Sequence, residues 1–360
     1  MAFKAKVRPA SVSDFEAIAQ VCGRNGMPIS DRPAWERGWT AHPFRDQFEG
    51  IPIGWVLEGP AGEVVGSISN HFFLYQWQGQ TIRAAAAGNW AVDTEHRSSS
   101  LSLGSHFFGQ KNLDLLLNAS ASMVAAQLMP LYKALKVPSP GYDQSFLWVV
   151  SPRRAAASAL AKKKIPAAGL VSFPAGAALW ARDVFKRSGR GSPSTRVIEL
   201  QAFDERFDQF WQRRSLSAKH LVAIRNQSLL TWRYASRLEK GLTFILVLEE
   251  NNAMAGYVIL NRYDRAGLKT DQITDLQVLS ENGAHVRDLV LGAIAHARKS
   301  GADMVEMQGF GEFKRNAARA LNPHVYQYPV WQTFYKAVKP ELQTALADAS
   351  SWDASPFDSD

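Results

Sequence analysis

The segment VDTEHRSSSLSLG, residues 92–104, holds the residue types in this chain that are best suited to binding an anion. An apolar strand ends there, small polar residues follow, and helical spacing begins. A helix that starts after such a turn presents unpaired backbone N–H groups, which bind anions such as a pyrophosphate. We therefore predict a phosphate-binding turn made by Val92, Arg97, Ser98, Ser99, Ser100, Leu101, Ser102 and Leu103. The competing interpretation is a serine-rich surface turn that only caps its own helix.

Polar side chains beside this turn could orient an amine for reaction. Asp93 and Glu95 flank the turn, and Asn89 precedes it on the strand. A carboxylate or amide at such a place can accept a proton or a hydrogen bond from an attacking amine. The alternative for the two acids is that they are solvated loop carboxylates. We take Glu95 and Asn89 as candidate catalytic residues.

The composition excludes several other chemistries. Cys22 is the single cysteine, so a disulfide framework and a thiolate-rich zinc site are excluded, and we predict no metal site. Gly309 and Gly311 lack the third glycine of a dinucleotide-binding fingerprint. No Gly-x-Ser-x-Gly elbow occurs. The opening residues contain no apolar leader, and no run of about 18 apolar residues follows. We therefore expect a cytoplasmic protein.

The net charge of +8 comes from one segment. Residues 151–200 carry 10 Lys/Arg and 2 Asp/Glu, whereas the chain on either side is neutral. This pattern indicates a basic connector between two neutral domains and no nucleic-acid partner. The connector could contact an anionic membrane surface through Trp180 and its basic residues. We favour a linker that folds back over the domains, because Pro166 and Pro174 limit any helix there.

Hydrophobic periodicity predicts an α/β protein with mixed sheets. The expected order is strand, two helices, three strands, then alternating helices and strands, ending in a strand at 146–150. From residue 197 a similar order recurs and ends in a strand at 330–336. We expect domains at 1–150 and 197–340, joined by a linker at 151–196 rich in Pro, Gly and Ser and followed by an acidic tail at 341–360.

The first half resembles the GNAT superfamily of acyl-CoA-dependent N-acyltransferases. VRPASVSDFEAIAQV is similar to that superfamily's first strand and helix. VDTEHRSSSLS resembles its acyl-CoA loop, with Arg97, Ser100 and Ser102 at the three motif positions and serine in place of both glycines. LMPLYKALKV resembles the last helix, where a tyrosine protonates the leaving thiolate, and Tyr132 is the matching residue.

In the second half, LLTWRY at 229–234 is similar to a segment of tandem GNAT and Fem-like acyltransferases. The loop 279–283 has no equivalent of the acyl-CoA motif, so this half is expected to be a degenerate copy. The resemblance implies two GNAT-like domains in tandem and an N-acyltransferase. Its donor would be acetyl-CoA or another acyl-CoA, and its acceptor a small-molecule amine or sugar amine. The alternatives are a non-catalytic tandem GNAT protein that binds a ligand or partner, and a Fem-like transferase of cell-envelope or polysaccharide metabolism.

Overall fold

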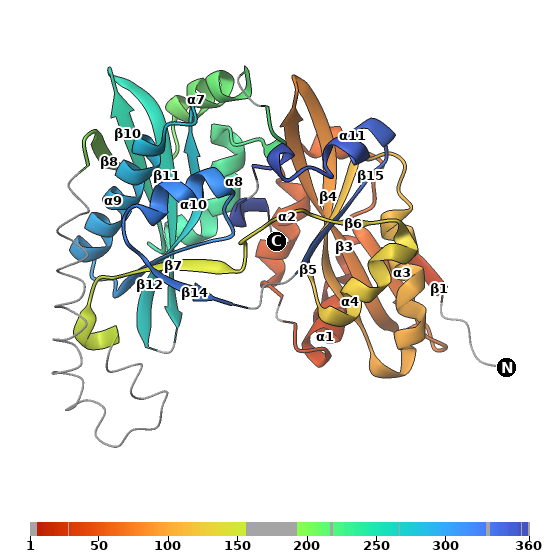
Figure 1. Cartoon of the computed structure of the whole chain (residues 1–360). Coiled ribbons are helices and arrows are strands. Elements are labelled where there is room, and N and C mark those ends of the chain that lie inside the picture. The colour runs from red at the N-terminus through yellow and green to blue at the C-terminus, as the bar shows by residue number, and fades with distance from the viewer. Residues whose placement is uncertain are drawn as a thin grey trace.

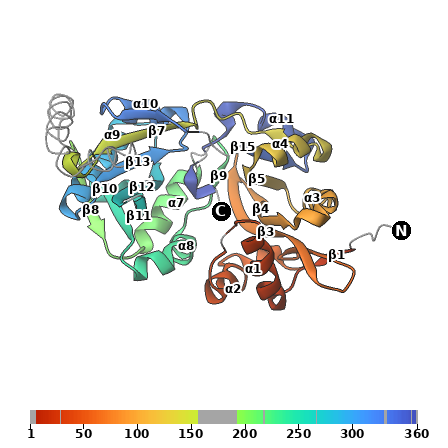
Figure 2. The same ribbon diagram turned by 90° about the horizontal axis from the view of Figure 1, so that it is seen from below.

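Two mixed β-sheets lie side by side, each with helices on both faces (Figures 1 and 2). The computed structural model describes residues 6–27, 29–155, 193–216, 219–265, 267–328, 332–353 and 355–358. No helix in these ranges is long and apolar enough to cross a membrane. Most of the expected basic connector, including Trp180, lies outside the described residues.

The first sheet comes mainly from the N-terminal half. In spatial order it contains β1 (Lys6–Pro9), β2 (Gly54–Glu58), β3 (Val64–Trp77), β4 (Gln80–Val92), β5 (Leu115–Ala121), β15 (Gln332–Ala337) and β6 (Leu135–Lys136), while β9 (Val222–Ala223) pairs with β3. The pair β3–β4 is the long antiparallel hairpin around the turn Gln78-Gly79, where both residues have positive φ. Strands β4 and β5 run parallel.

The second sheet comes mainly from the C-terminal half. In spatial order it contains β14 (His324–Gln327), β7 (Gln144–Val149), β13 (Met304–Gln308), β12 (Leu268–Val278), β11 (Ala253–Arg265), β10 (Thr243–Glu250) and β8 (Arg196–Leu200). Strands β12 and β13 run parallel, and the other pairs are antiparallel. The mixed α/β class expected from the sequence is thereby confirmed.

The two sheets repeat one topology with exchanged strands. In the first sheet β15 lies beside β5, on the side away from β4. In the second sheet β7 lies beside β13 in the same way, on the side away from β12. Each half of the chain therefore gives a strand to the other half's sheet, and Figure 1 shows yellow β7 beside blue β14, and blue β15 beside β5. The expected division, in which 146–150 ends the first sheet and 330–336 ends the second, is corrected here. In β7, Phe146 and Trp148 fill the second core, and this strand needs a partner on both edges.

Helices of the first half cover both faces of the first sheet. The helices are α1 (Phe15–Arg24), α2 (Arg32–Thr40), α3 (Ser100–Phe108) and α4 (Met123–Leu128), with 3-10 turns η1 (Val12–Asp14), η2 (Arg45–Phe48), η3 (Thr94–Ser99) and η4 (Met129–Tyr132). Residues Phe15, Ile18 and Cys22 of α1 are buried at the helical spacing expected from the sequence. Pro130 ends α4 and starts η4, since it cannot donate an i→i−4 hydrogen bond.

In the second half, α9 covers one face of the sheet, while α7 and α8 pack on the strands β11 and β10. The bounds are α7 (Glu205–Leu216), α8 (Gln227–Glu239), α9 (Gly283–Lys299), α10 (Glu312–Arg319) and α11 (Pro340–Ala345), with short turns η5 (Ala349–Ser351) and η6 (Pro356–Asp358). Helix α8 does not begin until Gln227. Residues 222–223 pair with β3 instead, and the Asn226 side chain caps α8 by accepting from the Leu229 N–H at 3.1 Å.

The C-terminal segment is part of the core. One apolar cluster contains Ala84 of the first sheet, Tyr257 of the second, and Leu346 and Phe357 of the last residues. Leu346 and Phe357 are almost fully buried. The residues expected to form an acidic tail at 341–360 are therefore, where described, part of the core, because Leu346 and Phe357 dock them between the sheets.

Candidate active site

Strands β4 and β5 pair over a short stretch and then part. The parallel ladder joins Ala84–Ala86 to Leu115–Leu117, whereas β4 continues to Val92 and β5 to Ala121. A bulge lies just beyond the ladder, where Asn89 adopts φ 48°. Ser67 Oγ donates to the Asn89 carbonyl at 2.8 Å and fixes the bulge to β3. Beyond the ladder, the backbone groups of β4 and β5 thus do not hydrogen-bond to each other.

The predicted phosphate-binding turn is helical. Residues Thr94–Ser99 form η3, which runs into α3 at Ser100. No described residue from Arg97 to Leu103 has positive φ, so serine in place of glycine costs no backbone strain in this conformation. The His96 N–H donates to Asp93 O, which leaves fewer free N–H groups than an open turn would. Neither Asp93 nor Ser99 caps this segment with its side chain.

The side chains of this turn are only partly accessible. Those of Arg97, Ser98 and Leu101 are exposed, those of Ser99, Ser100 and Ser102 are half-buried, and those of Val92 and Leu103 are buried. The Trp90 indole N–H donates to Ser100 Oγ at 3.1 Å, which attaches the start of α3 to the end of β4. Arg24 binds Asp93 through contacts of 2.7 and 3.1 Å, which holds the turn against α1.

Tyr132 lies against the first turns of α3. Its hydroxyl donates to the Leu101 carbonyl at 3.3 Å, and its ring stacks on Phe108 at 5.1 Å between centroids. Gly104 makes this approach available, since a Cβ there would lie 2.3 Å from the Tyr132 hydroxyl. Burial raises the pKa of Tyr132, so the phenol is protonated at neutral pH. The structure thus brings Tyr132 to the predicted turn.

The other two candidate catalytic residues are placed differently. Asn89 lies on the β4 bulge, and its Nδ2 donates to Ser69 Oγ at 3.4 Å. Glu95 is exposed in the first turn of η3. The structure therefore groups Tyr132 with the turn, keeps Asn89 on the adjoining strand, and leaves Glu95 on the surface.

The corresponding place in the second sheet is already filled. Its bulge lies at Thr274, and the next residue, Asp275, accepts from Arg225 Nε at 2.9 and 3.0 Å. The Tyr257 hydroxyl donates to the same carboxylate at 2.8 Å. The Asn282 side chain caps α9 by accepting from the Ala284 N–H at 2.9 Å. The helix start of this half thus has a side-chain cap, which η3 in the first half lacks, and the Asp275 carboxylate is bound by the protein's own groups.

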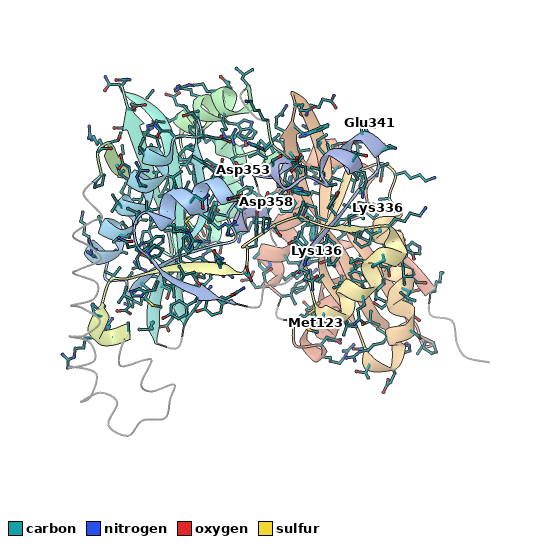
Figure 3. The ribbon with its side chains drawn as sticks, in the orientation of Figure 1. Met123, Lys136, Lys336, Glu341, Asp353 and Asp358 are labelled. Carbon is teal, nitrogen blue, oxygen red and sulfur yellow. The ribbon has the colours of Figure 1, made fainter. Side chains whose placement is uncertain are left out.

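Buried charges attach the C-terminal segment to the second half. Asp353 accepts from Lys314 Nζ at 2.6 Å and from Arg214 Nη2 at 2.9 Å. These two cations hold the pKa of Asp353 well below its usual range despite its burial. Arg225 donates to Ser355 Oγ at 3.0 Å, and Figure 3 shows Asp353 and Asp358 between the two sheets. Nothing in the sequence pattern indicated these pairs, because acidic residues near a chain end are usually solvated.

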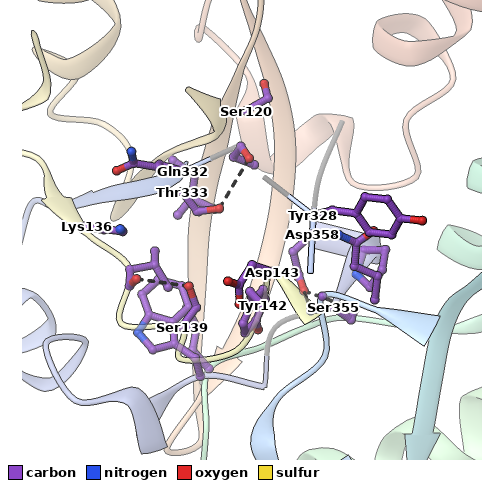
Figure 4. Close-up of a pocket in the computed structure, with 18 of the residues that line it drawn as sticks. Ser120, Lys136, Ser139, Tyr142, Asp143, Tyr328, Gln332, Thr333, Ser355 and Asp358 are labelled. Carbon is purple, nitrogen blue, oxygen red and sulfur yellow. Dashed lines mark hydrogen bonds between the residues drawn. The ribbon is translucent and has the colours of Figure 1, made fainter. Parts of the chain in front are cut away.

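A cavity of about 1170 Å³ lies between the sheets. It extends from the end of β5 and β15 to the end of β13, with the C-terminal segment along one wall (Figure 4). Its walls include Tyr75, Tyr142, Gln308, Thr333 and Asp358. No sequence pattern indicates this site, since its residues come from segments far apart in the chain. The described residues contain no cluster of His, Cys, Asp and Glu that could hold a metal ion.

Comparison with known proteins identifies the fold. No protein-family model and no curated protein matches the chain. Among solved structures, a GCN5-related N-acetyltransferase from Anabaena variabilis matches 93% of this chain and 73% of its own, with a TM-score of 0.57 and 14% identity. Another from Kribbella flavida matches 96% and 72%, with a TM-score of 0.58 and 14% identity. A probable N-acyltransferase from Enterococcus faecalis matches 95% and 74%, with a TM-score of 0.58 and 12% identity. Both sheets with their helices are therefore GNAT-like.

Proposed function

We propose that this protein is an acyl-CoA-dependent N-acyltransferase that binds its donor in the first GNAT-like domain. The observation that carries this proposal is the parted strand pair β4–β5 beside a helix start with no side-chain cap. An uncapped helix start offers N–H groups and a positive dipole end to a phosphate. In the second domain the Asp275 side chain of the corresponding strand is bound by Arg225, and the helix is capped by Asn282. In this proposal each chain therefore has one donor site.

The residues present suit an acyl-CoA. Arg97 and Ser98 are exposed beside the helix start and can contact phosphates. Beyond Ala86, β4 pairs with β3 but not with β5, and its edge on the β5 side can hold the donor's amide-containing arm by strand-like hydrogen bonds. The thioester supplies an activated acyl group. In the transfer the amine nitrogen attacks the carbonyl carbon, a C–N bond forms, the C–S bond breaks, and the amine loses one proton while the thiolate gains one.

In this proposal Tyr132 returns the proton to sulfur. Its protonated phenol lies at the start of α3, beside the turn where the donor would bind. The central cavity reaches the end of β5 through Ala119 and Ser120, so an acceptor bound there would approach from the second domain. Holding the acyl donor and the amine acceptor in reacting orientation accounts for a large part of the rate gain in a transfer between two bound substrates.

The experiment that tests the proposal is ligand-linked stabilisation. Acetyl-CoA and longer acyl-CoAs at a hundredfold excess over the dissociation constant should raise the free energy of unfolding by about 2.7 kcal/mol. Transfer to an amine is then followed as thiol release. A rise in stability without thiol release with any amine would favour a non-catalytic ligand-binding protein, which the partly used N–H groups of η3 also fit. No stabilisation by any acyl-CoA would contradict the proposal.

Ser100→Val is expected to weaken acyl-CoA binding by about tenfold or more. The added methyl groups occupy the start of α3, and loss of the hydroxyl releases the Trp90 indole N–H. Binding is measured by calorimetry, with Ala284→Val at the start of α9 as the matched control, for which no change is expected. Equal affinity of Ser100→Val and wild type would place the donor elsewhere.

Tyr132→Phe is expected to lower kcat by about a hundredfold with little change in KM, since general acids contribute 10²–10⁴-fold. Loss of the hydrogen bond to Leu101 should cost about 1 kcal/mol of stability, so folding remains intact. Steady-state kinetics decide, with Tyr263→Phe in the second domain as the control. An unchanged kcat would remove Tyr132 from the mechanism.

A further inference from the structure

We propose that the cavity between the two sheets binds a polyhydroxylated ligand carrying a primary ammonium group, with Asp358 as the partner of that ammonium. The class meant is an amino sugar or an oligosaccharide of amino sugars. The inference rests on the proposed function only in taking this ligand to be the acyl acceptor. The site itself is argued from the cavity.

The walls of the cavity suit hydroxyl groups. Gln272, Gln308, Gln327 and Gln332 line it, together with Thr333. An amide both donates and accepts, as a hydroxyl does, so a ring of amides can pair with a polyol in many orientations. Gln272 Oε1, Gln327 Nε2 and Thr333 Oγ1 already have partners within the protein. A purely apolar ligand would leave the remaining polar atoms of these side chains unpaired, at about 1–3 kcal/mol for each buried one. The walls thus favour a polyol over a lipid or a flat aromatic ligand.

Aromatic side chains supply faces for sugar rings. Tyr142, Tyr328 and Trp352 line the same cavity. The Trp352 indole N–H donates to Leu346 O at 2.9 Å, and its ring packs on Tyr335 at 5.3 Å, so its position is fixed before any ligand binds. A fixed ring costs little entropy when it contacts the C–H face of a pyranose. The volume, about 1170 Å³, is above the usual range for a drug-sized ligand and accommodates a disaccharide.

Asp358 supplies the negative charge. It lies between the two sheets, and 14% of its side chain remains accessible although the residue is deep in the molecule (Figures 3 and 4). Its Oδ2 accepts from the Ser355 N–H at 2.8 Å and lies 3.8 Å from Arg225 Nη2. Its Oδ1 and the hydroxyl of Tyr75, which lines the same cavity, are both buried, and neither makes a hydrogen bond of normal geometry in the described part of the chain. The two groups interact with each other, since the Asp358 carboxylate adds to the effect of burial in raising the pKa of Tyr75.

The nearby cation does not satisfy this carboxylate. Arg225 donates its Nε to Asp275, its Nη1 to the Ala223 carbonyl and its Nη2 to Ser355 Oγ. Its charge is therefore shared with Asp275, and its Nη2 lies 3.8 Å from Asp358 Oδ2, beyond hydrogen-bond distance. Burial accordingly raises the pKa of Asp358. An ammonium group entering from the cavity would supply both the hydrogen-bond donor and the positive charge that this carboxylate lacks.

The test compares two disaccharides that differ at the amine. The β-1,4-linked glucosamine dimer and cellobiose have the same ring skeleton, with ammonium groups in the first and hydroxyls in the second. Binding to the full chain is measured by calorimetry without acyl-CoA. The wild type is expected to bind the glucosamine dimer at least about tenfold more tightly than cellobiose, which corresponds to about 1.4 kcal/mol. Equal affinities, or no binding of the dimer at 10 mM or so, would overturn the proposal.

Three variants locate the site. Asp358→Asn keeps the shape of the side chain and removes its charge. This variant is expected to bind the glucosamine dimer no more tightly than cellobiose. Glu341→Gln removes an exposed charge far from the cavity and should bind as wild type (Figure 3). Ala119→Phe fills the cavity from β5 and should abolish binding of both sugars. Unaltered binding by Asp358→Asn or by Ala119→Phe would contradict the site, and if the first variant fails to fold, the second still tests it.

The outcomes separate this inference from the proposed function. If the dimer binds as described but no acyl transfer occurs, the site stands and the transferase proposal fails. If acyl-CoA binds and an amine is acylated while the dimer does not bind, the transferase proposal stands and this inference fails.

Discussion

A fragment of residues 1–155 is expected to be unfolded by itself and to fold when mixed with a fragment of residues 193–360. The reason is the exchange of strands. Without the second half, the first sheet loses β15, which pairs with both β5 and β6. The buried rings of Phe334 and Tyr335 leave with it, and each such loss costs about 3–5 kcal/mol. Strand β7 would at the same time lack both of its partners.

Circular dichroism and cooperative urea unfolding measure this outcome. Each fragment alone should show no cooperative transition, whereas the equimolar mixture should recover one. Co-purification of a tagged first fragment with the second provides an independent readout. A first fragment that unfolds cooperatively alone would mean that its sheet is complete without β15.

Arg225→Met is expected to lower the free energy of unfolding by about 3–5 kcal/mol, because it leaves Asp275 buried without its counter-ion. Both side chains are fully buried. Arg225 also stacks on the ring of Phe357 at 4.3 Å and so holds the C-terminal segment. The loss therefore reaches the wall of the central cavity as well as β12.

The double variant Arg225→Met/Asp275→Asn separates the charge from the packing. It should recover part of the lost stability, since no uncompensated charge remains. Arg213→Met, on an exposed face of α7, is the control and should stay within about 0.5 kcal/mol of wild type. Chemical denaturation gives all four values. Equal stability of Arg225→Met and Arg213→Met would show that the buried pair does not hold the segment.

Local patterns predicted the elements of this fold but not their pairing. The spacing of Phe15, Ile18 and Cys22 predicts α1, and Pro130 predicts the end of α4, because both effects act within a few residues. The sheet to which β7 or β15 belongs depends on edges formed by the other half of the chain. Both strands are apolar enough for either sheet, so the pattern within 144–149 or 332–337 could not decide.

The candidate sites, too, could be predicted from the sequence only where their residues are neighbours in the chain. The turn at 92–104 is continuous in sequence, so its place between β4 and α3 could be predicted, and only its 3-10 conformation could not. The cavity is built by side chains such as Tyr75, Gln308 and Asp358, which no spacing rule connects. The sequence predicted only an acidic tail around Asp353 and Asp358, since the cations that neutralise Asp353 lie far away in sequence at Arg214 and Lys314.

Backbone amide NMR during a titration with acetyl-CoA tests most directly whether the first domain holds the donor. We expect one saturable set of chemical-shift changes centred on residues 94–103, where η3 follows β4 without a side-chain cap and runs into α3. Residues 279–286, at the capped start of α9, should not respond. Changes centred on residues 279–286, or none at millimolar acetyl-CoA, would contradict a donor site in the first domain.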